Sequence, residues 1–535
     1  MQTAFTALDA AIVIAYLAAL AAVGVYFSRR QTTLDDYFVA RHSMAWLPVG
    51  LSLMAALNSG IDYLMQPSAT IRYGVVLLAG TSSWIFVYPW VSRVTLPFYR
   101  RLNLYTAYEF LEARFDVRVR TLAAAIFIVW RVGWMATAIY VPCLAVNAAT
   151  GGKVDLRTMI VVLGVLVTLY TTLGGIQAVI WNDVIQFCIM FGGLGATVWI
   201  ALSHVPGGLS EIVTAARDAG KMSLPPPMLA GTGLLDHARM FFLQPITLAA
   251  LVITMVLGRM ASYTSDQVMV QRFQTTKSIR DSRRAFVINA AGDVLWMFGL
   301  AFVGLALFAY FQHHALPAEF ASDKILPYFM SQAFPAGAVG LVIAAILAAS
   351  LSSIDSAINS CTTVIVVDLY GRFRFGPQAT RAAGGDDAKQ LMVSRIATIG
   401  LGLAGTLLAV NVSRIGTLLE IANKLINAFS GPLFAIYLLA MFSRRATSRS
   451  ALAGGVVGTF VSYYVAYHTP ISFLWPSAFG LVATVLTGLA IGVIDPQPGA
   501  HERDAGRLTW WAVMRTSEPS VDGFGAQPAA GPLGR

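Results

Sequence analysis

The chain has 535 residues, of which 57% are hydrophobic and only 12% are charged. Soluble domains carry about 25% charged residues, so this composition excludes a soluble protein and indicates a polytopic membrane protein. The formal net charge of +10 does not indicate nucleic-acid binding, because the basic residues gather in alternate short loops, as membrane topology requires.

Apolar windows of about 20 residues, the length that crosses a bilayer, predict about 13 transmembrane helices. They lie at 9–28, 44–72, 74–98, 119–148, 158–174, 178–203, 239–261, 285–312, 335–368, 391–411, 414–442, 450–468 and 472–494. The first window lacks a basic start and a cleavage site, so we expect a retained helix. The positive-inside rule then places the N-terminus outside and the C-terminus in the cytoplasm.

The second span is interrupted in its middle. It reads SLMAALNSGIDYLMQPSATIRYG over 52–74, and Asn58, Ser59 and Gly60 break the apolar run. Small polar residues at this depth permit local unwinding, and the freed carbonyls can bind a cation. A kink at Pro67 with polar residues packed against neighbouring helices explains the pattern equally well.

The ninth span carries hydroxyls, an amide and a carboxylate in an apolar helix at 344–370. At about 100° per residue, six of its polar side chains fall within one stripe: Ser352, Ser353, Ser356, Asn359, Ser360 and Thr363. Serines often join two helices by close packing, but that role does not explain Asp355. Polar groups inside a membrane usually face a bundle interior or a transport path, so the stripe predicts a buried ion site.

Several long segments resemble the sodium:solute symporter family. They are DDYFVARHSMAWLPVGLSLMAALNSG at 35–60, LPFYRRLNLYTAYEFLEARF at 96–115, TLYTTLGGIQAVIWNDVIQ at 168–186, SDQVMVQRF at 265–273 and the segment 349–370. The resemblance runs from about Asp35 to Phe442. Asn182 stands where family members commonly carry Thr.

The resemblance implies an all-α polytopic membrane protein with a leucine-transporter-like core of 5+5 inverted repeats. The expected parts are an N-terminal extra helix and first cytoplasmic loop (1–43), two five-helix repeats (44–203 and 239–442), an extracellular loop (204–238) with a short helix near 209–219, two C-terminal helices (443–495) and a disordered cytoplasmic tail (496–535). It also implies sodium as a co-transported ion.

In the family, sodium lies between the broken first core helix and the eighth. The matching ligands here are the carbonyls of Ala55, Asn58 and Ala349 and the hydroxyls of Ser352 and Ser353, which are oxygen ligands that suit a hard cation. Some members hold a second cation, for which Asp183, Ser352, Asp355 and Ser356 match. Asp355 replaces a Ser of the sialic acid transporters, and Asp183 can instead cap its helix.

The candidate solute ligands are less specific. They are Asp62, Gln66, Trp84, Tyr88, Arg131, Tyr140, Arg259 and Asn427. Arg131 can meet a substrate carboxylate, but structural pairing with Asp183 or Asp355 is the stronger interpretation. Arg259 is either a solute contact or a charge in a loop, and Asp62 suits a cationic group or a sugar hydroxyl.

Together these features predict a sodium-driven symporter in the cell inner membrane that imports a small polar solute. An organic monocarboxylate ranks ahead of a sugar, sialic acid or an amino acid such as proline. A solute sensor that acts through a separate signalling partner is the alternative of another class, and proton coupling through Asp355 or Asp183 is the alternative for the ion. No phosphate loop, metal-ligand spacing or nucleophile motif is present, so we expect neither an enzyme nor a cofactor beyond sodium. The expected partners are the solute, sodium and the lipid bilayer, without nucleic acid.

Overall fold

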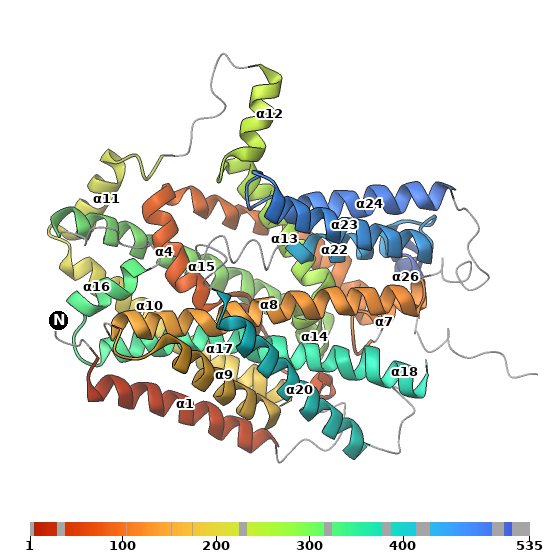
Figure 1. Cartoon of the computed structure of the whole chain (residues 1–535), viewed down its shortest axis with the longest axis horizontal. Helices are drawn as coiled ribbons and strands as arrows, with labels where there is room; N and C mark the ends of the chain where they lie inside the picture. The colour runs from red at the N-terminus through yellow and green to blue at the C-terminus, as the bar shows by residue number, and fades with distance from the viewer. Residues whose placement is uncertain are drawn as a thin grey trace, which may run out of the picture.

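The structure is a computed structural model that describes residues 5–28, 38–102, 104–150, 152–173, 175–223, 233–314, 324–376, 387–412, 428–494 and 508–515. Long helices run roughly parallel through the molecule (Figure 1). In the part that is described, nine spans are long and apolar enough to cross a membrane. Shorter apolar helices such as α3 (Trp46–Leu57) complete the bundle, as the hydropathy pattern predicts.

The first repeat begins after the peripheral helix α1 (Ala7–Ser28), and its first span is interrupted. Helices α3 and α4 (Gly60–Tyr73) form its first, broken span. The second span, predicted as one apolar run, consists of η2 (Gly74–Ser83), α5 (Trp84–Trp90), η3 (Val91–Thr95) and α6 (Leu96–Leu102). Short α7 (Glu109–Arg114) precedes α8 (Val117–Ala149), α9 (Leu156–Leu173) and α10 (Ile176–His204).

Two short helices, α11 (Gly208–Asp218) and α12 (Leu234–Leu243), connect the repeats, and α11 matches the helix expected near 209–219. The second repeat contains α13 (Leu248–Ser265), α14 (Gln267–Gln274), α15 (Ile279–His313), α17 (Ala338–Val364), α20 (Asp387–Ala409) and α22 (Ala428–Phe442). Helix α16 (Ile325–Ala333) precedes α17, which continues through η5 (Ile365–Gly371) into α18 (Arg372–Phe375). Helices α23 (Ser448–His468) and α24 (Pro476–Ile494) pack on α22.

The span predicted at 239–261 is divided between α12 and α13, and the chain breaks again just past the predicted end. Helix α12 ends at Leu243, and α13 continues beyond the predicted end to Ser265. Asp266 then adopts an extended conformation (φ −92°, ψ 116°) and caps α14 by accepting a hydrogen bond from the Val268 amide at 2.9 Å. The first span of each repeat is therefore broken, which is the arrangement that places transporter sites at mid-membrane.

The tail expected to be disordered contains a docked helix. Helix α26 (Trp510–Arg515) has a fully buried Val513, whose carbonyl accepts a hydrogen bond from Arg101 Nη1 at 2.7 Å. The polar composition of the tail as a whole concealed this short apolar run.

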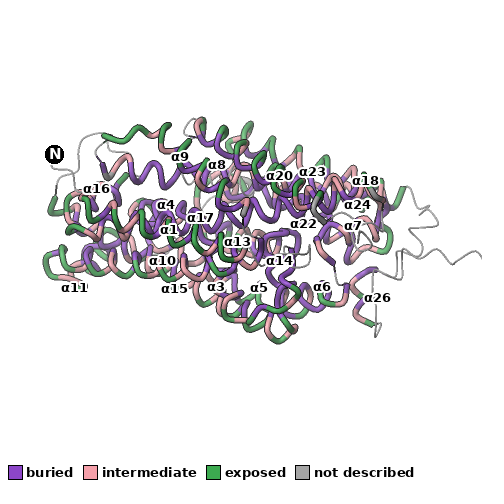
Figure 2. Tube along the Cα trace, turned by 90° about the horizontal axis from the view of Figure 1, so that it is seen from below, coloured by how far each residue is buried: buried purple, intermediate pink, exposed green. Residues whose placement is uncertain are grey.

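Helix α17 forms the centre of the molecule. Its 18-residue apolar window is 89% buried, whereas the corresponding window of α1 is 17% buried. The burial pattern of Figure 2 agrees, with α17, α4 and α14 largely purple and outer helices such as α9 carrying green stretches. A helix surrounded by protein can carry polar groups that lipid would not tolerate.

Candidate functional site

The break in the second span is an extended segment, and Pro67 does not cause it. Asn58 (ψ 134°) and Ser59 (ψ 169°) leave the helical conformation between α3 and α4, whereas α4 continues through Pro67. Asp62 accepts a hydrogen bond from the Ser59 amide at 2.7 Å, and Ser59 Oγ accepts one from the Ile61 amide at 3.2 Å. This capping box satisfies the amides that the break exposes.

Gly60 lets the break lie directly against α17. A Cβ atom at this position would be 2.2 Å from Ser350 Oγ and 2.7 Å from the Ile346 carbonyl. The start of α4 is thus held beside α17 because residue 60 has no side chain.

Four of the five predicted sodium ligands meet at this contact. Ser352 Oγ lies 2.8 Å from the Ala55 carbonyl and 2.9 Å from the Ala349 carbonyl, and Ser353 Oγ lies 3.3 Å from the latter. The oxygens outnumber the hydroxyl hydrogens, so this buried cluster suits a hard cation. Asn58 is buried and its extended backbone removes its carbonyl from the helix, but its role as the fifth ligand remains a prediction.

The residues predicted for a second cation separate into two groups. Asp183 Oδ2 accepts hydrogen bonds from Ser52 Oγ at 2.5 Å and from Arg272 Nη2 at 2.9 Å, and the same Arg272 nitrogen contacts Ser356 Oγ. Asp355 instead faces α9, where it accepts hydrogen bonds from Tyr170 at 2.9 Å and Thr171 at 2.7 Å. A guanidinium therefore supplies positive charge beside Asp183, and the second cation site stays a prediction.

Arg272 was not expected here. Its position between the predicted spans 239–261 and 285–312 places it in a basic loop, but its side chain is fully buried on α14. The available signal was its place in SDQVMVQRF at 265–273, one of the segments that carry the family resemblance.

Near the C-terminal end of α17, its polar stripe faces one partner helix, α14, as the periodicity predicts. Gln271 of α14 donates hydrogen bonds to Asn359 Oδ1 at 3.2 Å and Thr363 Oγ1 at 3.3 Å, and it accepts one from Ser360 at 3.0 Å. Helix α14 thus covers the part of the stripe that lies C-terminal to the predicted sodium ligands.

Arg131 pairs with neither Asp183 nor Asp355. It forms a buried ion pair with Asp266, the residue that breaks the α13–α14 span. Its guanidinium carbon also lies 4.7 Å from the Trp130 ring centroid and 5.4 Å from that of Trp134. Arg131 is thus paired within the protein, with Asp266 in place of the predicted partners Asp183 and Asp355.

Arg259 occupies a buried cluster. Its Nη2 lies 2.6 Å from Asp293 Oδ2, which also accepts a hydrogen bond from Trp84 Nε1 at 2.8 Å. Its Nη1 donates to Ser83 Oγ at 2.5 Å, and its guanidinium carbon lies 4.4 Å from the Trp84 ring centroid. The loop interpretation of Arg259 is therefore wrong, and Asp293 and Ser83 are site candidates that the sequence analysis missed.

The remaining solute candidates differ in position. Gln66 and Tyr140 are buried at 6% and 8% exposure. Tyr88 is 41% exposed and stacks on Phe286 with ring centroids 6.1 Å apart, which favours a packing role. Asn427 lies outside the described residues.

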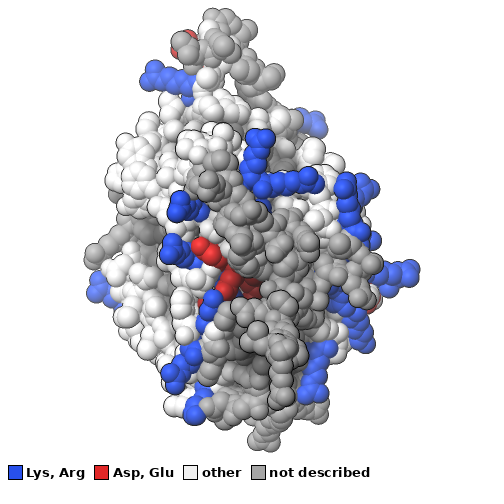
Figure 3. All heavy atoms as spheres, turned by 90° about the vertical axis from the view of Figure 1, so that its right-hand side faces the viewer, with Lys and Arg blue, Asp and Glu red and all other residues white. Residues whose placement is uncertain are grey.

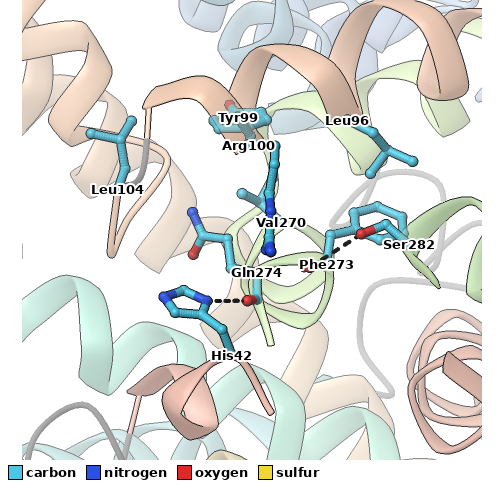
Figure 4. Close-up of a pocket in the computed structure, with 9 residues that line it drawn as sticks. All are labelled: His42, Leu96, Tyr99, Arg100, Leu104, Val270, Phe273, Gln274 and Ser282. Atoms are coloured by element: carbon cyan, nitrogen blue, oxygen red, sulfur yellow. Dashed lines mark hydrogen bonds between the residues drawn. The ribbon is translucent and has the colours of Figure 1, made fainter. Parts of the chain in front are cut away.

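A separate cavity of about 220 Å³ lies beside α14 (Figure 4). Its lining residues are His42, Leu96, Tyr99, Arg100, Leu104, Val270, Phe273, Gln274 and Ser282. None of the predicted solute ligands lines this cavity, so it is distinct from the cluster around Arg259.

Comparison with known proteins agrees with this geometry. The chain matches the sodium:solute symporter family over residues 37–458. It is 32% identical over 488 residues to the sodium/sialic acid symporter SiaT of Proteus mirabilis, covering 90% of this chain and 94% of the relative. It is 30% identical over 463 residues to the human sodium-coupled monocarboxylate transporter 1, covering 83% of this chain and 71% of that protein.

Solved structures extend the comparison to the fold. A sodium-coupled sialic acid symporter in a substrate-bound, outward-open state superposes with a TM-score of 0.81 at 30% identity, covering 92% of this chain and 98% of that one. Mhp1, a nucleobase-cation-symport-1 family transporter, gives a TM-score of 0.54 at 15% identity and shares the fold, covering 89% of this chain and 99% of its own. The leucine-transporter-like architecture inferred from the sequence is thereby confirmed.

Proposed function

Because this chain belongs to the sodium:solute symporter family, we propose that its sodium-driven transport imports a small organic acid, in first place a monocarboxylate. As a multi-pass membrane transporter it works by alternating access, in which one helix bundle moves against the other around a central site. Each sodium ion that enters contributes about 2.3 kcal/mol per 100 mV of membrane potential to solute accumulation.

The observation that carries the substrate class is the position of Arg259. It is a buried cation on a broken span, and its guanidinium lies over the Trp84 ring. A guanidinium binds carboxylates through two parallel hydrogen bonds.

A sialic acid is the second candidate, because two relatives at 32% and 31% identity are named sodium/sialic acid symporters. Sialic acid also carries a carboxylate, so it satisfies the same argument from Arg259. A neutral sugar carries no carboxylate, so no comparable observation at this cluster supports it.

We further propose that the end of the molecule carrying α7, α18 and α26 lies in the cytoplasm of a bacterial inner membrane, with the N-terminus outside. Figure 3 shows Lys and Arg side chains spread over this end. Hydrogen bonds from Arg100 to the carbonyls of Thr276 and Lys277 connect α6 with the segment between α14 and α15. Both segments lie between predicted spans, on the side where basic residues gather. The positive-inside rule supports this orientation.

Uptake into proteoliposomes tests the function. Labelled lactate, pyruvate, sialic acid, glucose and proline are supplied with an inward sodium gradient, or with potassium in place of sodium. We expect one of the carboxylates to accumulate only with sodium. Accumulation of glucose alone would contradict the organic-acid proposal, and sodium binding without any uptake would favour a sensor.

A further inference from the structure

Asp293 lies opposite the break in the α3–α4 span. On the same helix, a Cβ atom at Gly292 would be 2.8 Å from Met54 Cγ, just before the break. Trp296 packs edge-on against Tyr63, just after the break, with ring centroids 5.4 Å apart. Asp293 stands between these two contacts on α15 and therefore at the level of the extended segment.

Carboxyl groups and a guanidinium lie around this segment. Asp62 caps the break and Asp293 lies at its level, so two carboxyl groups share the region with the guanidinium of Arg259. Asp62 is partly occupied by the Ser59 amide that it caps. Asp293 depends on Arg259 and Trp84 for its hydrogen bonds at 2.6 Å and 2.8 Å.

A solute carboxylate that binds Arg259 competes with Asp293 for the same guanidinium. Asp293 is 1% exposed, so water cannot readily replace the lost partner. Removing one member of a buried ion pair is strongly unfavourable, because the other charge remains desolvated without compensation. A solute that also supplies a hydrogen-bond donor to Asp293 avoids this cost.

Building on the proposed function, we infer that the transported acid carries a hydroxyl or an ammonium group beside its carboxylate, and that Asp293 receives this donor. Asp293 is then a specificity-determining residue. The Arg259–Asp293 pair opens to accept the carboxylate and its neighbouring donor together. Acids that lack the donor leave Asp293 unpaired and bind poorly.

Four three-carbon acids test this inference, because they differ only at the second carbon. Lactate carries a hydroxyl there, alanine an ammonium group, propionate only hydrogen, and pyruvate a carbonyl. Each competes with the labelled solute identified by the uptake panel, in proteoliposomes containing the full chain. We expect lactate or alanine to compete about tenfold or more better than propionate and pyruvate, since an unpaired buried polar group discriminates strongly.

If sialic acid is the labelled solute, its 2-deoxy-2,3-didehydro analogue provides the matched comparison. The analogue keeps the carboxylate and lacks the hydroxyl on the adjacent carbon. We expect it to compete at least about tenfold less well than sialic acid.

The variant Asp293→Asn supplies the second measurement. We expect it to reduce the preference for the donor-bearing acid, whereas Asp236→Asn, at an exposed acid on α12, retains the preference. Equal competition by acids with and without the donor overturns the inference while leaving the proposed function intact, as does an unchanged preference in Asp293→Asn. Failure of every carboxylate to bind overturns the proposed function itself. The wild-type comparison remains decisive if Asp293→Asn does not fold.

Discussion

Ser352 joins two helices through its hydroxyl group, and Ser353 lies beside it on the same helix. Ser352 Oγ bridges the Ala55 carbonyl of α3 and the Ala349 carbonyl of its own helix at 2.8 Å and 2.9 Å. In a helix whose core is this deeply buried, an apolar side chain would pack as well. The predicted sodium site, which needs oxygen ligands, accounts for hydroxyls at these positions.

Replacing both serines by alanine should abolish sodium-stimulated uptake, because two of the predicted ligands are lost. Sodium should also cease to stabilise the purified protein against heat. A ligand at 100 times its dissociation constant stabilises a folded protein by about 2.7 kcal/mol, which is readily measured as a shift in melting temperature.

The control for this pair is Ser350→Ala. Ser350 lies on the same helix, and its buried hydroxyl has no hydrogen-bond partner among the described residues. This variant should keep its sodium response. Normal sodium dependence in the double variant would remove the site assignment.

At the residue scale, the sequence predicted the positions of hydroxyl groups better than the pairing of charges. Hydroxyls in a hydrocarbon segment are conspicuous, so periodicity placed Ser352 and Ser353 on one polar stripe, and the family resemblance identified them as the predicted ligands. Arg272 lies near the end of the short helix α14, and Asp293 lies in an apolar run within α15. Hydropathy does not reveal which neighbouring charge pairs with either residue. The pairing of Arg131 with Asp266 likewise depends on contacts that no spacing rule supplies.

At the scale of elements, the two broken helices differ in how clearly the sequence indicates the break. Asn58, Ser59 and Gly60 form a cluster of residues that disfavour helix, and the first break was predicted. The second break rests on Asp266 alone, a residue that serves as N-cap of α14 through its 2.9 Å hydrogen bond. A single capping residue between two helical runs is a weak signal, and Asp266 lies past the predicted end of the span at 261, so this break was not predicted.

Gly60→Ala tests how closely α4 must approach α17. The new methyl group would overlap Ser350 Oγ and the Ile346 carbonyl, at 2.2 Å and 2.7 Å. Overpacking of this kind costs about 1–3 kcal/mol, and displacement of α4 should also weaken sodium binding. Melting temperature and the sodium concentration for half-maximal uptake measure the two effects.

Gly192→Ala is the matched control for this change. Gly192 lies in α10, and a Cβ atom there would have no other atom within 4 Å. It should leave both quantities unchanged. Wild-type behaviour of Gly60→Ala would show that the break does not need this close contact.

For the whole molecule, the predicted sodium ligands and the α14 contacts lie along the same face of α17. Ala55 of α3 contacts this face at Ser352. Gln271 and Arg272 of α14 cover the part that lies further toward the C-terminus of α17. Both attachments link the broken spans to α17. Sodium, by joining α3 to α17, is expected to favour the state in which the contacts between α14 and α17 also remain closed.

A thiol at Ser360 reports this closure. The Ser360 hydroxyl donates to Gln271 Oε1 at 3.0 Å and is fully buried, so a cysteine there becomes reactive only when α14 moves away. In a Cys188→Ser background, which removes the exposed native thiol, we expect Ser360→Cys to react several-fold faster with a water-soluble thiol reagent in potassium than in sodium. Mass spectrometry of the labelled protein gives both rates. Native Cys361 is also fully buried, and the Cys188→Ser parent without Ser360→Cys gives its labelling rate in each salt. Equal rates at Ser360→Cys in the two salts would mean that sodium binding and closure by α14 are independent, and the coupling argued from their shared face on α17 would be wrong.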